Sequence, residues 1–372
     1  MRLLISGGGT AGHVYPALAV AKALQSDERF ARLDDNSRGI LYVGGAGSLE
    51  QDIVARSGLG FQGIPVRGGL RGLSPVRALA NGMALARAFG QCRRLIQAFR
   101  PNVILATGGY VCAPVVAAGW LARVPSLVYL PDLSPGWTIR SLVPLARRAA
   151  VSFAEARRYF PSGRVVVTGY PVRPELFQSD KLKAREFWNL APDLPALLVA
   201  GGSRGAHSIN VAVGEALPEL VQLGQIIHVS GPRDEAWLQE RRQALPPGQR
   251  ERYRLFAYLY EEMPQALVAC DLAVSRAGAS VLGEHPAAGL PSVLVPYIGG
   301  HRDQERNAEY LARAGAAVVL PDTGLSGPRL QATVARLLGD PVALAEMARR
   351  ARLLVQPRAA QNIVDELWKI ST

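Results

Sequence analysis

The stretch LLISGGGTAGHVYPALAVAKAL at residues 3–24 decides the fold, together with a similar stretch, LLVAGGSRGAHSINVAVGEAL, at residues 197–217. Each one begins with a short apolar run, continues into a glycine-rich turn that contains a histidine, and ends in an alanine-rich helical pattern. This order of strand, glycine turn and helix is typical of the units that build parallel sheets. The repetition predicts two similar α/β halves.

Further apolar runs follow each of these stretches and alternate with helical patterns. Because the runs are short, rich in β-branched residues and not alternating, they indicate strands buried on both faces of a parallel sheet. Right-handed crossovers between such strands give two doubly wound, Rossmann-like sheets. The predicted strands are Leu3–Ser6, Ile40–Val43, Val103–Ala106, Ser126–Leu130 and Val165–Thr168 in the first half, and Ala196–Ala200, Ile226–Val229, Leu272–Ser275, Ser292–Val295 and Ala317–Leu320 in the second.

The segment between the halves, GYPVRP at residues 169–174, contains two prolines and a glycine and reads as a linker. We therefore predict a first domain at 1–168, a linker at 169–175 and a second domain at 176–372, whose final helix is free to cross back to the first domain. Ligands of doubly wound sheets bind beyond the carboxyl ends of the strands. Two such domains facing a cleft would bind one substrate each.

The charge is distributed unevenly along the chain. The net charge is +12, and residues 1–170 contain 20 Arg and Lys against 8 Asp and Glu, whereas residues 171–372 contain 22 of each. Eight arginines lie between residues 51 and 100. This asymmetry favours an anionic partner for the first half, either an acidic lipid surface or a phosphorylated substrate, with a solvated arginine-rich surface as the alternative. No recognition motif for nucleic acid accompanies the charge, so we expect none to bind.

The composition excludes several other classes of protein. The three cysteines, Cys92, Cys112 and Cys270, are far apart, which argues against a disulfide framework or a zinc site and favours buried thiols. No secretory signal is visible, and the most apolar stretch, from Val111 to Leu130, is interrupted by an arginine and two prolines. We expect a protein without a transmembrane helix.

Four glycine- or serine-rich loops follow predicted strands and are suited to binding phosphate groups. They are residues 7–13 (GGGTAGH), 107–110 (TGGY), 201–206 (GGSRGA) and 275–284 (SRAGASVLGE). Glycine lets backbone N–H groups approach an anion at the start of a helix. The second loop, at residues 107–110, is explained equally well as a tight strand-to-helix turn that binds no ligand.

Two of the residues in these loops have more than one reading. His13 is suited to be a general base, a hydrogen-bond donor to phosphate, or a structural residue. Glu284 lies near a predicted diphosphate site, where a carboxylate suits neutral ribose hydroxyls, and it is otherwise an acid at a helix start. The signatures of a metal site, an Asp-x-Asp pair after a strand, and of a P-loop lysine do not occur, so we expect neither metal nor cofactor.

The order and spacing of these motifs resemble the MurG family, the UDP-N-acetylglucosamine transferases that make lipid II from lipid I. The resemblance covers nearly the whole chain, through GGGTAGHVYPALAVAKAL, ATGGYVCAPVVAA, VTGYPVR, GGSRGAHSIN, SRAGAS, PAAGLPSVLVPY and DQERNAEYL. It implies a GT-B fold and an inverting, metal-independent transfer to the C4 hydroxyl of an undecaprenyl-pyrophosphoryl acceptor. It also implies a peripheral enzyme at the cytoplasmic face of the bacterial membrane, which its basic half would bind.

The resemblance also implies roles for individual residues. For the donor, it implies that Arg173 and Ser203 contact the phosphates, Glu284 the ribose, Gln304 the sugar and the main chain of Tyr260 the uracil. For catalysis, His13 is the first candidate for the general base and Asp132 the second. The remaining residues expected at the donor are Arg204, Gly278, Ala279 and Ser280, and those expected at the acceptor diphosphate are Gly8, Gly9, Thr10, Gly12, His13, Gly108, Gly109 and Tyr110.

Three parts of the chain depart from the pattern of that family. Residues 129–132 are Tyr-Leu-Pro-Asp where the family has His-Glu-Gln-Asn, so Asp132 replaces an amide with a carboxylate. Leu259 replaces an aromatic residue, and Asp303 replaces a histidine. Because these changes concern the donor sugar and the base more than the diphosphate, three alternatives stay open: a related glycolipid transferase with another sugar or lipid, a UDP-N-acetylglucosamine 2-epimerase, and a non-catalytic nucleotide-sugar-binding subunit.

Overall fold

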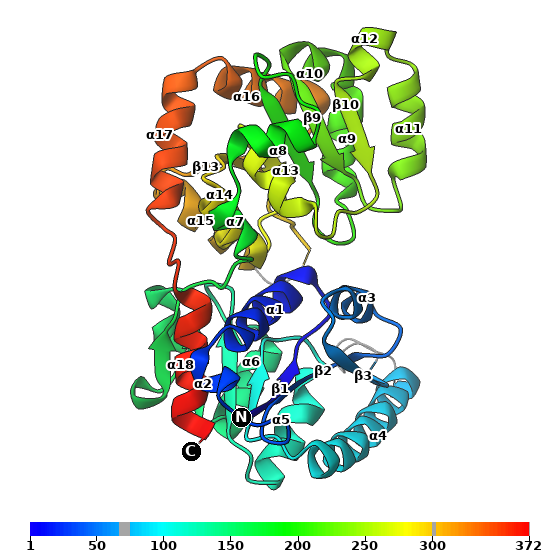
Figure 1. Ribbon diagram of the computed structural model, residues 1–372. Helices are drawn as coiled ribbons and strands as arrows, with labels where there is room; N and C mark the ends of the chain where they lie inside the picture. The colour runs from blue at the N-terminus through cyan, green and yellow to red at the C-terminus, as the bar shows by residue number, and fades with distance from the viewer. Residues whose placement is uncertain (67–74, 300–302, 372) are drawn as a thin grey trace. The chain divides into compact units, whose positions relative to one another are not determined.

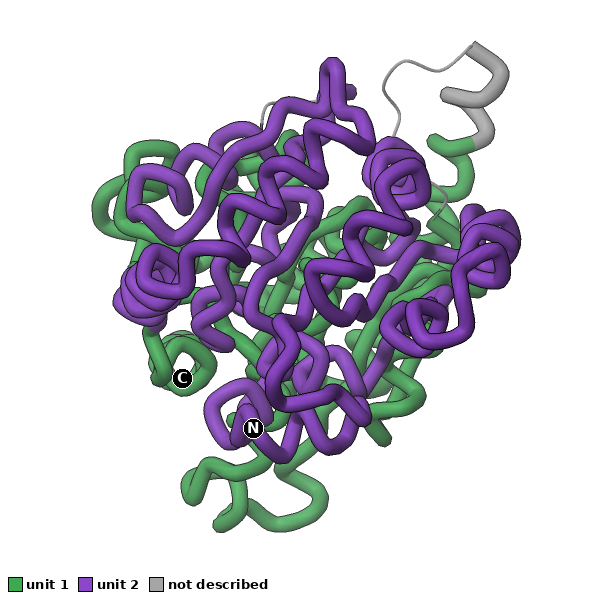
Figure 2. The backbone as a smooth tube through the Cα atoms, turned by 90° about the horizontal axis from the view of Figure 1, so that it is seen from above, with its two compact units in different colours: residues 1–172, 356–372 green, residues 173–355 purple. Residues whose placement is uncertain are grey.

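The chain forms two compact units, which Figure 2 shows in different colours. The computed structural model describes residues 1–66, 75–299 and 303–371, without the side chains of residues 75–80. Unit 1 comprises Met1–Val172 and Gln356–Thr372, and unit 2 comprises Arg173–Val355. The boundary falls inside the predicted linker, and the last segment of the chain belongs to unit 1.

Unit 1 is built on one parallel sheet of seven strands in the order β3-β2-β1-β4-β5-β6-β7. The central strand β1 pairs with β2 and β4, so that Leu3 lies opposite both Ile40 and Val103. The strands are β1 (Arg2–Ser6), β2 (Gly39–Gly45), β3 (Gly60–Ile64), β4 (Val103–Ala106), β5 (Ser126–Leu130), β6 (Arg148–Val151) and β7 (Val165–Val167).

Helices cover both faces of this sheet (Figure 1). On one face, Cys92 and Val115 belong to the same hydrophobic core as Leu4 and Ile104 of the sheet. On the other face, α18 packs against α1 and contacts β4 and β5. The helical segments of unit 1 are α1 (Ala11–Gln25), α2 (Glu28–Ala31), α3 (Leu49–Arg56), α4 (Pro75–Phe99), α5 (Cys112–Leu121), α6 (Trp137–Leu142), η1 (Val143–Leu145), η2 (Ala154–Tyr159), η3 (Ser162–Arg164) and α18 (Ala359–Ser371).

The final helix α18 is attached to unit 1 by polar contacts as well as by packing. The Asn362 side chain donates to the carbonyl of Thr168 at 3.0 Å, and the Gln361 side chain donates to Asp27 at 2.8 Å. Glu366 is 4% exposed and forms an ion pair with Arg148. These contacts join the end of the chain to elements near its beginning.

Unit 2 repeats the architecture with six parallel strands in the order β10-β9-β8-β11-β12-β13. Its strands are β8 (Ala196–Ala200), β9 (Gln225–Val229), β10 (Tyr253–Phe256), β11 (Leu272–Ser275), β12 (Ser292–Leu294) and β13 (Ala317–Val319). Its helical segments are α7 (Glu175–Gln178), α8 (Lys181–Phe187), α9 (His207–Glu215), α10 (Leu217–Leu223), α11 (Glu235–Gln243), α12 (Pro247–Arg250), α13 (Met263–Ala269), η4 (Ala279–Leu282), α14 (Glu284–Ala288), α15 (Asp303–Arg313), α16 (Gly327–Leu338) and α17 (Pro341–Arg352).

The prediction of two doubly wound parallel sheets is confirmed, but three strands lack the expected apolar pattern. Strands β3 and β10 each form one of the two edges of their sheet, where one side needs no strand partner. Strand β3 contains two glycines, and three of the four residues of β10 are only partly buried. Strand β6 reads Arg-Ala-Ala-Val, and its short run of alanines is ambiguous between a helix and a strand.

The apolar stretch from Val111 to Leu130 folds as α5 and β5. Among the described residues, no helix is long and apolar enough to cross a membrane. The three cysteines are buried free thiols, as expected.

The core of unit 2 contains two buried histidines that make stability depend on pH. Burial lowers the pKa of His228 to about 3 and that of His285 to about 4. His228 contacts the hydroxyl of Tyr253 at 2.7 Å and the amide oxygen of Asn210 at 3.0 Å, and His285 contacts the hydroxyl of Ser292 at 2.7 Å. Both are therefore neutral in the folded protein well below the pH at which they gain a proton in the unfolded chain.

Acidification is expected to destabilise unit 2 through these histidines. Since the unfolded chain binds the additional protons, the stability is complete above about pH 6.5, and each histidine costs about 1.4 kcal/mol per pH unit below it until its own folded pKa is reached. Urea unfolding at pH 7.5 and 5.0 measures this loss. The variant His285→Asn should show a smaller difference between the two pH values than the wild type. An equal difference in both proteins would contradict the assignment.

Candidate functional site

Each sheet has one point at which the strand order reverses, and a pair of predicted loops lies there. In unit 1 the reversal falls between β1 and β4, so the loops at residues 7–13 and 107–110 are neighbours. In unit 2 it falls between β8 and β11, so the loops at 201–206 and 275–280 are neighbours. The carboxyl end of a parallel sheet at such a reversal is the usual ligand site of this architecture.

The two loops of unit 1 are in direct contact. The N–H of Gly8 donates to the carbonyl of Gly108 at 3.1 Å, and the Thr107 hydroxyl donates to the carbonyl of His13 at 2.7 Å. Gly108 has a φ of +119°, and a Cβ there would lie 2.7 Å from Cδ2 of His13. Any side chain at this position would therefore strain the backbone and displace the imidazole. Glycine is required at Gly108 to place the second loop against His13.

The contacts of His13 determine which ring nitrogen is basic. Its Nδ1 lies 3.1 Å from the carbonyl oxygen of Gly8 and 3.2 Å from the hydroxyl of Thr10. A carbonyl oxygen only accepts hydrogen bonds, so Nδ1 is the protonated nitrogen in the neutral ring. Nε2 then has the lone pair and is the atom suited to take a proton from an alcohol.

Glu50 holds the glycine loop from the side, and sequence reasoning gave it no role. Its carboxylate is 5% exposed and accepts from the N–H groups of Gly9 at 3.4 Å and Gly45 at 3.1 Å. The Tyr42 hydroxyl donates to the carbonyl of Gly7 at 2.9 Å. Both residues flank the glycine-rich segment GGAG at residues 44–47, which follows β2 and is the sequence signal that could have indicated them.

Asp132 and Tyr110 lie at the same edge of the sheet as His13. Asp132 follows β5, which neighbours β4, and its carboxylate is partly buried. It helps to raise the pKa of the buried Tyr129 well above the usual range, although burial is the larger cause. Tyr110 is 50% exposed at the end of the second loop. The structure therefore brings the predicted acceptor residues and both candidate bases to one sheet edge.

In unit 2 the structure joins three of the predicted donor residues. The guanidinium of Arg173 donates to Glu284 at 2.8 Å and to the carbonyl of Tyr260 at 2.9 Å. The side chains of Arg173 and Glu284 are each 11% exposed. The N–H of Tyr260 donates to Glu262 at 3.1 Å, so a uracil ring that binds this N–H must displace the Glu262 carboxylate.

The remaining donor residues follow the carboxyl ends of the strands of unit 2, in loops, in η4 and, for Gln304, in the first turn of α15. Gly205 has a φ of +77°, and a Cβ there would lie 2.0 Å from the carbonyl oxygen of Ser230, so the loop with Ser203 and Arg204 packs closely on the next loop. The amide oxygen of Gln304 accepts from the N–H of Tyr297 at 2.9 Å. Part of the preceding segment, residues 300–302, lies outside the described residues, as do Arg67, Arg71 and the side chain of Arg77 in the basic run.

One prediction about this edge is corrected in detail. The small residues from Gly278 to Ser280, after a predicted strand, predict the start of a helix whose dipole faces a diphosphate. The structure instead has a short 3-10 turn, η4, and the helix α14 begins only at Glu284 and has five residues. A phosphate beside Gly278, Ala279 and Ser280 would therefore meet a turn, and the contribution of a helix dipole would be small because α14 is short.

The comparisons with known proteins agree with this arrangement. The glycosyltransferase family 28 N-terminal domain matches residues 3–151, and the family 28 C-terminal domain matches residues 196–366. A relative from Roseiflexus sp. (strain RS-1) is 43% identical over 98% of this chain and 93% of its own length. It is named UDP-N-acetylglucosamine–N-acetylmuramyl-(pentapeptide) pyrophosphoryl-undecaprenol N-acetylglucosamine transferase. The crystal structure of Acinetobacter baumannii MurG has a TM-score of 0.71 and 26% identity and covers 99% of each chain. The chain belongs to the MurG family.

Membership of the MurG family fixes the GT-B fold, but the fold alone does not separate the rival functions. A UDP-N-acetylglucosamine 2-epimerase from Neisseria meningitidis also has a TM-score of 0.71, covering 99% of this chain and 100% of its own, at 14% identity. At that identity the likeness concerns the fold only. The distinction between transferase and epimerase therefore rests on sequence and on individual residues.

A network around Arg276 in this MurG-family chain was missed at the sequence level. The guanidinium of Arg276 pairs with Asp322 at 2.9 Å and donates to the hydroxyl of Ser208 at 2.8 Å and to the carbonyl of Val295 at 3.2 Å. These partners follow β13, open α9 and end β12, so one side chain connects the loops of several strands. Asp322 is 46 positions from Arg276, and only the strand order reveals that they meet.

Removal of the Asp322 carboxylate is expected to destabilise the loops that Arg276 connects at the carboxyl ends of the strands of unit 2. The Arg276 side chain is 12% exposed, and a charge this buried without its partner costs about 3–5 kcal/mol of stability at most. We expect Asp322→Ala to lower the melting temperature of the MurG-family enzyme and to weaken UDP binding about tenfold by calorimetry. Asp35→Ala, which breaks an exposed ion pair with Arg38 in unit 1, is the control. Similar melting temperatures for the two variants would contradict the role of Asp322.

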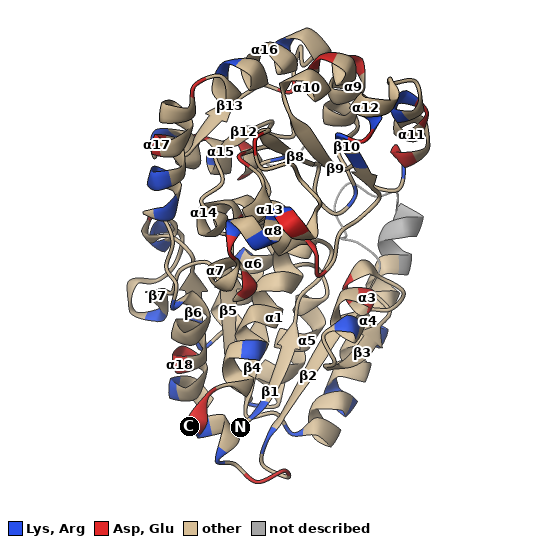
Figure 3. Ribbon diagram, turned by 45° about the horizontal axis from the view of Figure 1, so that its top comes forward, with Lys and Arg blue, Asp and Glu red and all other residues tan. Residues whose placement is uncertain are grey.

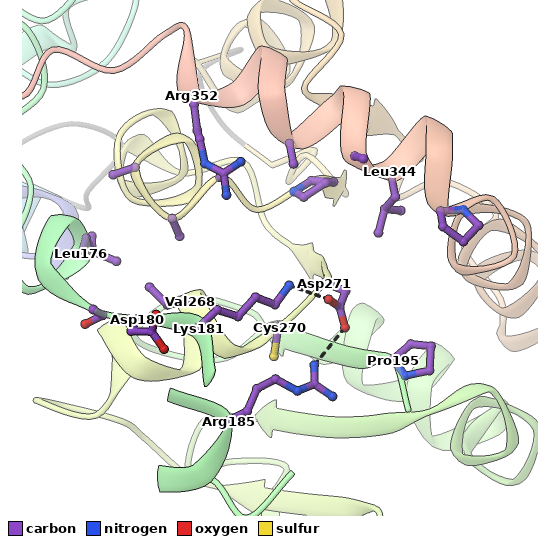
Figure 4. A pocket seen from close by; sticks show the side chains of 18 of the residues that line it. Leu176, Asp180, Lys181, Arg185, Pro195, Val268, Cys270, Asp271, Leu344 and Arg352 are labelled. Carbon is purple, nitrogen blue, oxygen red and sulfur yellow. Dashed lines mark hydrogen bonds and ion pairs between the residues drawn. The ribbon is translucent and has the colours of Figure 1, made fainter. Parts of the chain in front are cut away.

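A cavity of unit 2 lies away from the glycine loops and does not suit a diphosphate. It has a volume of 710 Å³ and lies at the starts of β8, β11 and β12, the edge opposite to the glycine loops (Figure 4). Asp271 pairs there with Lys181 at 2.6 Å and with Arg185 at 3.2 Å. Because these cations already have a carboxylate partner, the cavity offers little charge to an anion. It is not part of the candidate site.

Proposed function

We propose that this chain catalyses the inverting, metal-independent transfer of N-acetylglucosamine from UDP-N-acetylglucosamine to the C4 hydroxyl of lipid I, an undecaprenyl-pyrophosphoryl muramoyl-pentapeptide, and so forms lipid II for peptidoglycan synthesis. The observation that supports it most is the 43% identity, over nearly the full chain, to a relative named as this transferase. The glycine loops at both strand-order reversals supply the two anion sites that a diphosphate donor and a diphosphate acceptor require.

The acceptor would bind to unit 1. Its diphosphate would contact the backbone N–H groups of the loops that contain Gly9, Gly12 and Gly109. The sugar hydroxyl would approach Nε2 of His13, which takes the proton as the oxygen attacks the anomeric carbon. His13 is the first choice because the Gly8 carbonyl holds the ring in the tautomer that a base needs. Asp132 at the same sheet edge is the second choice.

The donor would bind to unit 2. Arg173 would turn from Glu284 to the diphosphate and stabilise the negative charge that builds up on the leaving UDP. Glu284 would then accept hydrogen bonds from the ribose hydroxyls. Ser203, Arg204 and the turn after Gly278 would contact the phosphates, and Gln304 the sugar.

We further propose a peripheral position at the cytoplasmic face of the cell membrane. Trp120 and Leu121 at the end of α5 are 55% and 58% exposed, and Arg123 follows them. Helix α4, which packs beside α5, adds Arg87, Arg93 and Arg94. Exposed aromatic and apolar side chains among arginines suit the headgroup region of an anionic bilayer, where each basic residue contributes about 1 kcal/mol.

A transfer assay tests the proposal directly. Radiolabelled UDP-N-acetylglucosamine is incubated with a short-chain lipid I analogue in the presence of EDTA, and we expect disaccharide lipid to form at the rate seen without EDTA. Conversion of the donor to its 2-epimer without acceptor would identify an epimerase instead. No turnover despite tight UDP binding would exclude N-acetylglucosamine transfer to lipid I. It would indicate that Asp132, in place of the asparagine of the family, goes with another sugar or lipid acceptor.

A further inference from the structure

Arginines line one edge of the seven-stranded sheet of unit 1, the edge that lies opposite to the glycine loops. Arg2 and Arg148 are the first residues of β1 and β6, and Arg38 and Arg164 directly precede β2 and β7. Because all strands of the sheet are parallel, their starts share one edge. Helix α18 adds one basic residue, Lys369; Lys and Arg are blue in Figure 3. The basic character of unit 1 therefore extends to an edge that the transfer reaction does not use.

A cavity of 350 Å³ lies in this edge. The starts of β6 and β7 and the end of α18 form it. The side chains that line it contain four cations and no carboxylate: the lining residues are Arg147, Arg148, Gly163, Arg164, Lys369 and Ile370.

The positive charge of the cavity is only partly balanced. The buried carboxylate of Glu366 forms ion pairs with Arg148 and with Lys369, the latter at 2.6 Å. Among the ion pairs of the described residues, none involves Arg147 or Arg164. Arg147 and Arg164 are exposed, and the side chains of Arg148 and Lys369 are 40% and 63% exposed, so these cations are accessible to an anion that enters the cavity from solvent.

We propose that this cavity binds a phosphate group. Guanidinium groups present pairs of N–H donors whose geometry matches phosphate oxygens, and an anion here would contact cations from two strand starts and one helix. The site is separate from the glycine loops, because it lies at the opposite edge of the sheet. Two sources share this chemistry, the headgroup of an anionic phospholipid and a soluble phosphate.

Gly163 allows the cavity to be blocked without removal of any cation. It is exposed, its φ is not positive, and no atom lies within 4 Å of the position that a Cβ would occupy. Gly163→Glu thus places a carboxylate among the arginines. Gly163→Ala controls for the side chain. Gly39→Glu controls for charge, because it adds the same carboxylate at the start of β2, where the nearest atom to a Cβ is 3.5 Å away on Phe99.

Two binding measurements test the proposal and separate the sources. Titration with inorganic phosphate is followed by calorimetry with UDP at saturation, and co-sedimentation is measured with phosphatidylcholine vesicles that contain phosphatidylglycerol. We expect Gly163→Glu to weaken binding about tenfold and Gly39→Glu to change it less than about twofold, because only the first carboxylate competes for the cations of the cavity. Transfer to a short-chain lipid I analogue should be unchanged in all variants.

The pattern of losses identifies the ligand. A loss with vesicles alone assigns the cavity to a lipid headgroup, a loss with free phosphate alone to a soluble ligand, and a loss with both to phosphate groups in general. Equal binding by Gly163→Glu and Gly39→Glu in both measurements would overturn the proposal. That result would leave the proposed transfer reaction untouched, because the transfer assay is scored separately.

Discussion

Replacement of His13 by alanine is expected to lower kcat by about 10²–10⁴-fold, the range found when a general base is removed. The reason is the fixed tautomer: the Gly8 carbonyl accepts from Nδ1 at 3.1 Å, which leaves Nε2 as the basic atom beside Gly108. Transfer to a short-chain lipid I analogue at saturating substrates measures the loss. A decrease of less than about tenfold would contradict the assignment of His13 as the base.

Two further variants separate the base from its neighbours. Thr10→Ala removes the hydroxyl 3.2 Å from Nδ1 but leaves the Gly8 carbonyl in place, so we expect it to reduce kcat only about twofold to fivefold. Asp132→Asn removes the charge of the second candidate. If His13 is the base, Asp132→Asn keeps most of kcat, and a larger loss for Asp132→Asn than for His13→Ala would exchange the two roles. UDP affinity should be unchanged in all three, since the donor loops belong to unit 2.

Replacement of Arg173 by alanine is expected to harm both stability and catalysis. The Glu284 carboxylate, whose side chain is 11% exposed, would lose the guanidinium that neutralises it, at a cost of about 3–5 kcal/mol in the free energy of unfolding. The leaving UDP would lose the cation that stabilises its developing charge, and the loss of one such group typically reduces the rate about 10²–10³-fold. Urea unfolding and kcat/KM for UDP-N-acetylglucosamine measure the two effects.

A double variant tells the two effects of Arg173 apart. Arg173→Met combined with Glu284→Gln removes both charges, so most of the lost stability should return while the activity stays low. Arg349→Ala is the matched control, because Arg349 pairs with Glu346 but is 63% exposed, and exposed pairs contribute about 0–1 kcal/mol. Recovery of activity in the double variant would show that Arg173 acts through stability alone.

The sequence reveals the strands that are apolar throughout, including the edge strands β7 and β13, and hides the three that lack such a run. Runs such as VILA at 103–106 and LLVA at 197–200 are apolar throughout because helices cover both sides of them. Strands β3 and β10 need no such pattern, since an edge strand has fewer neighbours to pack against. Strand β6 is short and alanine-rich, so its tertiary environment rather than its own propensity makes it a strand.

The candidate site divides in a similar way. The glycine loops can be predicted from the sequence, because a backbone position that only glycine can occupy appears in the motif as a glycine, as at Gly108 and Gly205. Asp322 has no such signal in the sequence, because its contact with Arg276 depends on the order of the strands. The ion pair between Arg173 and Glu284 joins residues 111 positions apart, and the motifs predicted each residue at the donor but not their contact with each other.

The return of α18 to unit 1 has a consequence for recombination between relatives. Unit 2 is one uninterrupted stretch, Arg173–Val355, whereas unit 1 is assembled from both ends of the chain. A single crossover after residue 172 would join the first part of one parent's unit 1 to the α18 of another, and the matching of Asn362 to Thr168 and of Glu366 to Arg148 would be lost wherever the parents differ. Exchange of donor specificity between homologues therefore calls for a cassette with two junctions, so that the native α18 stays with its own sheet.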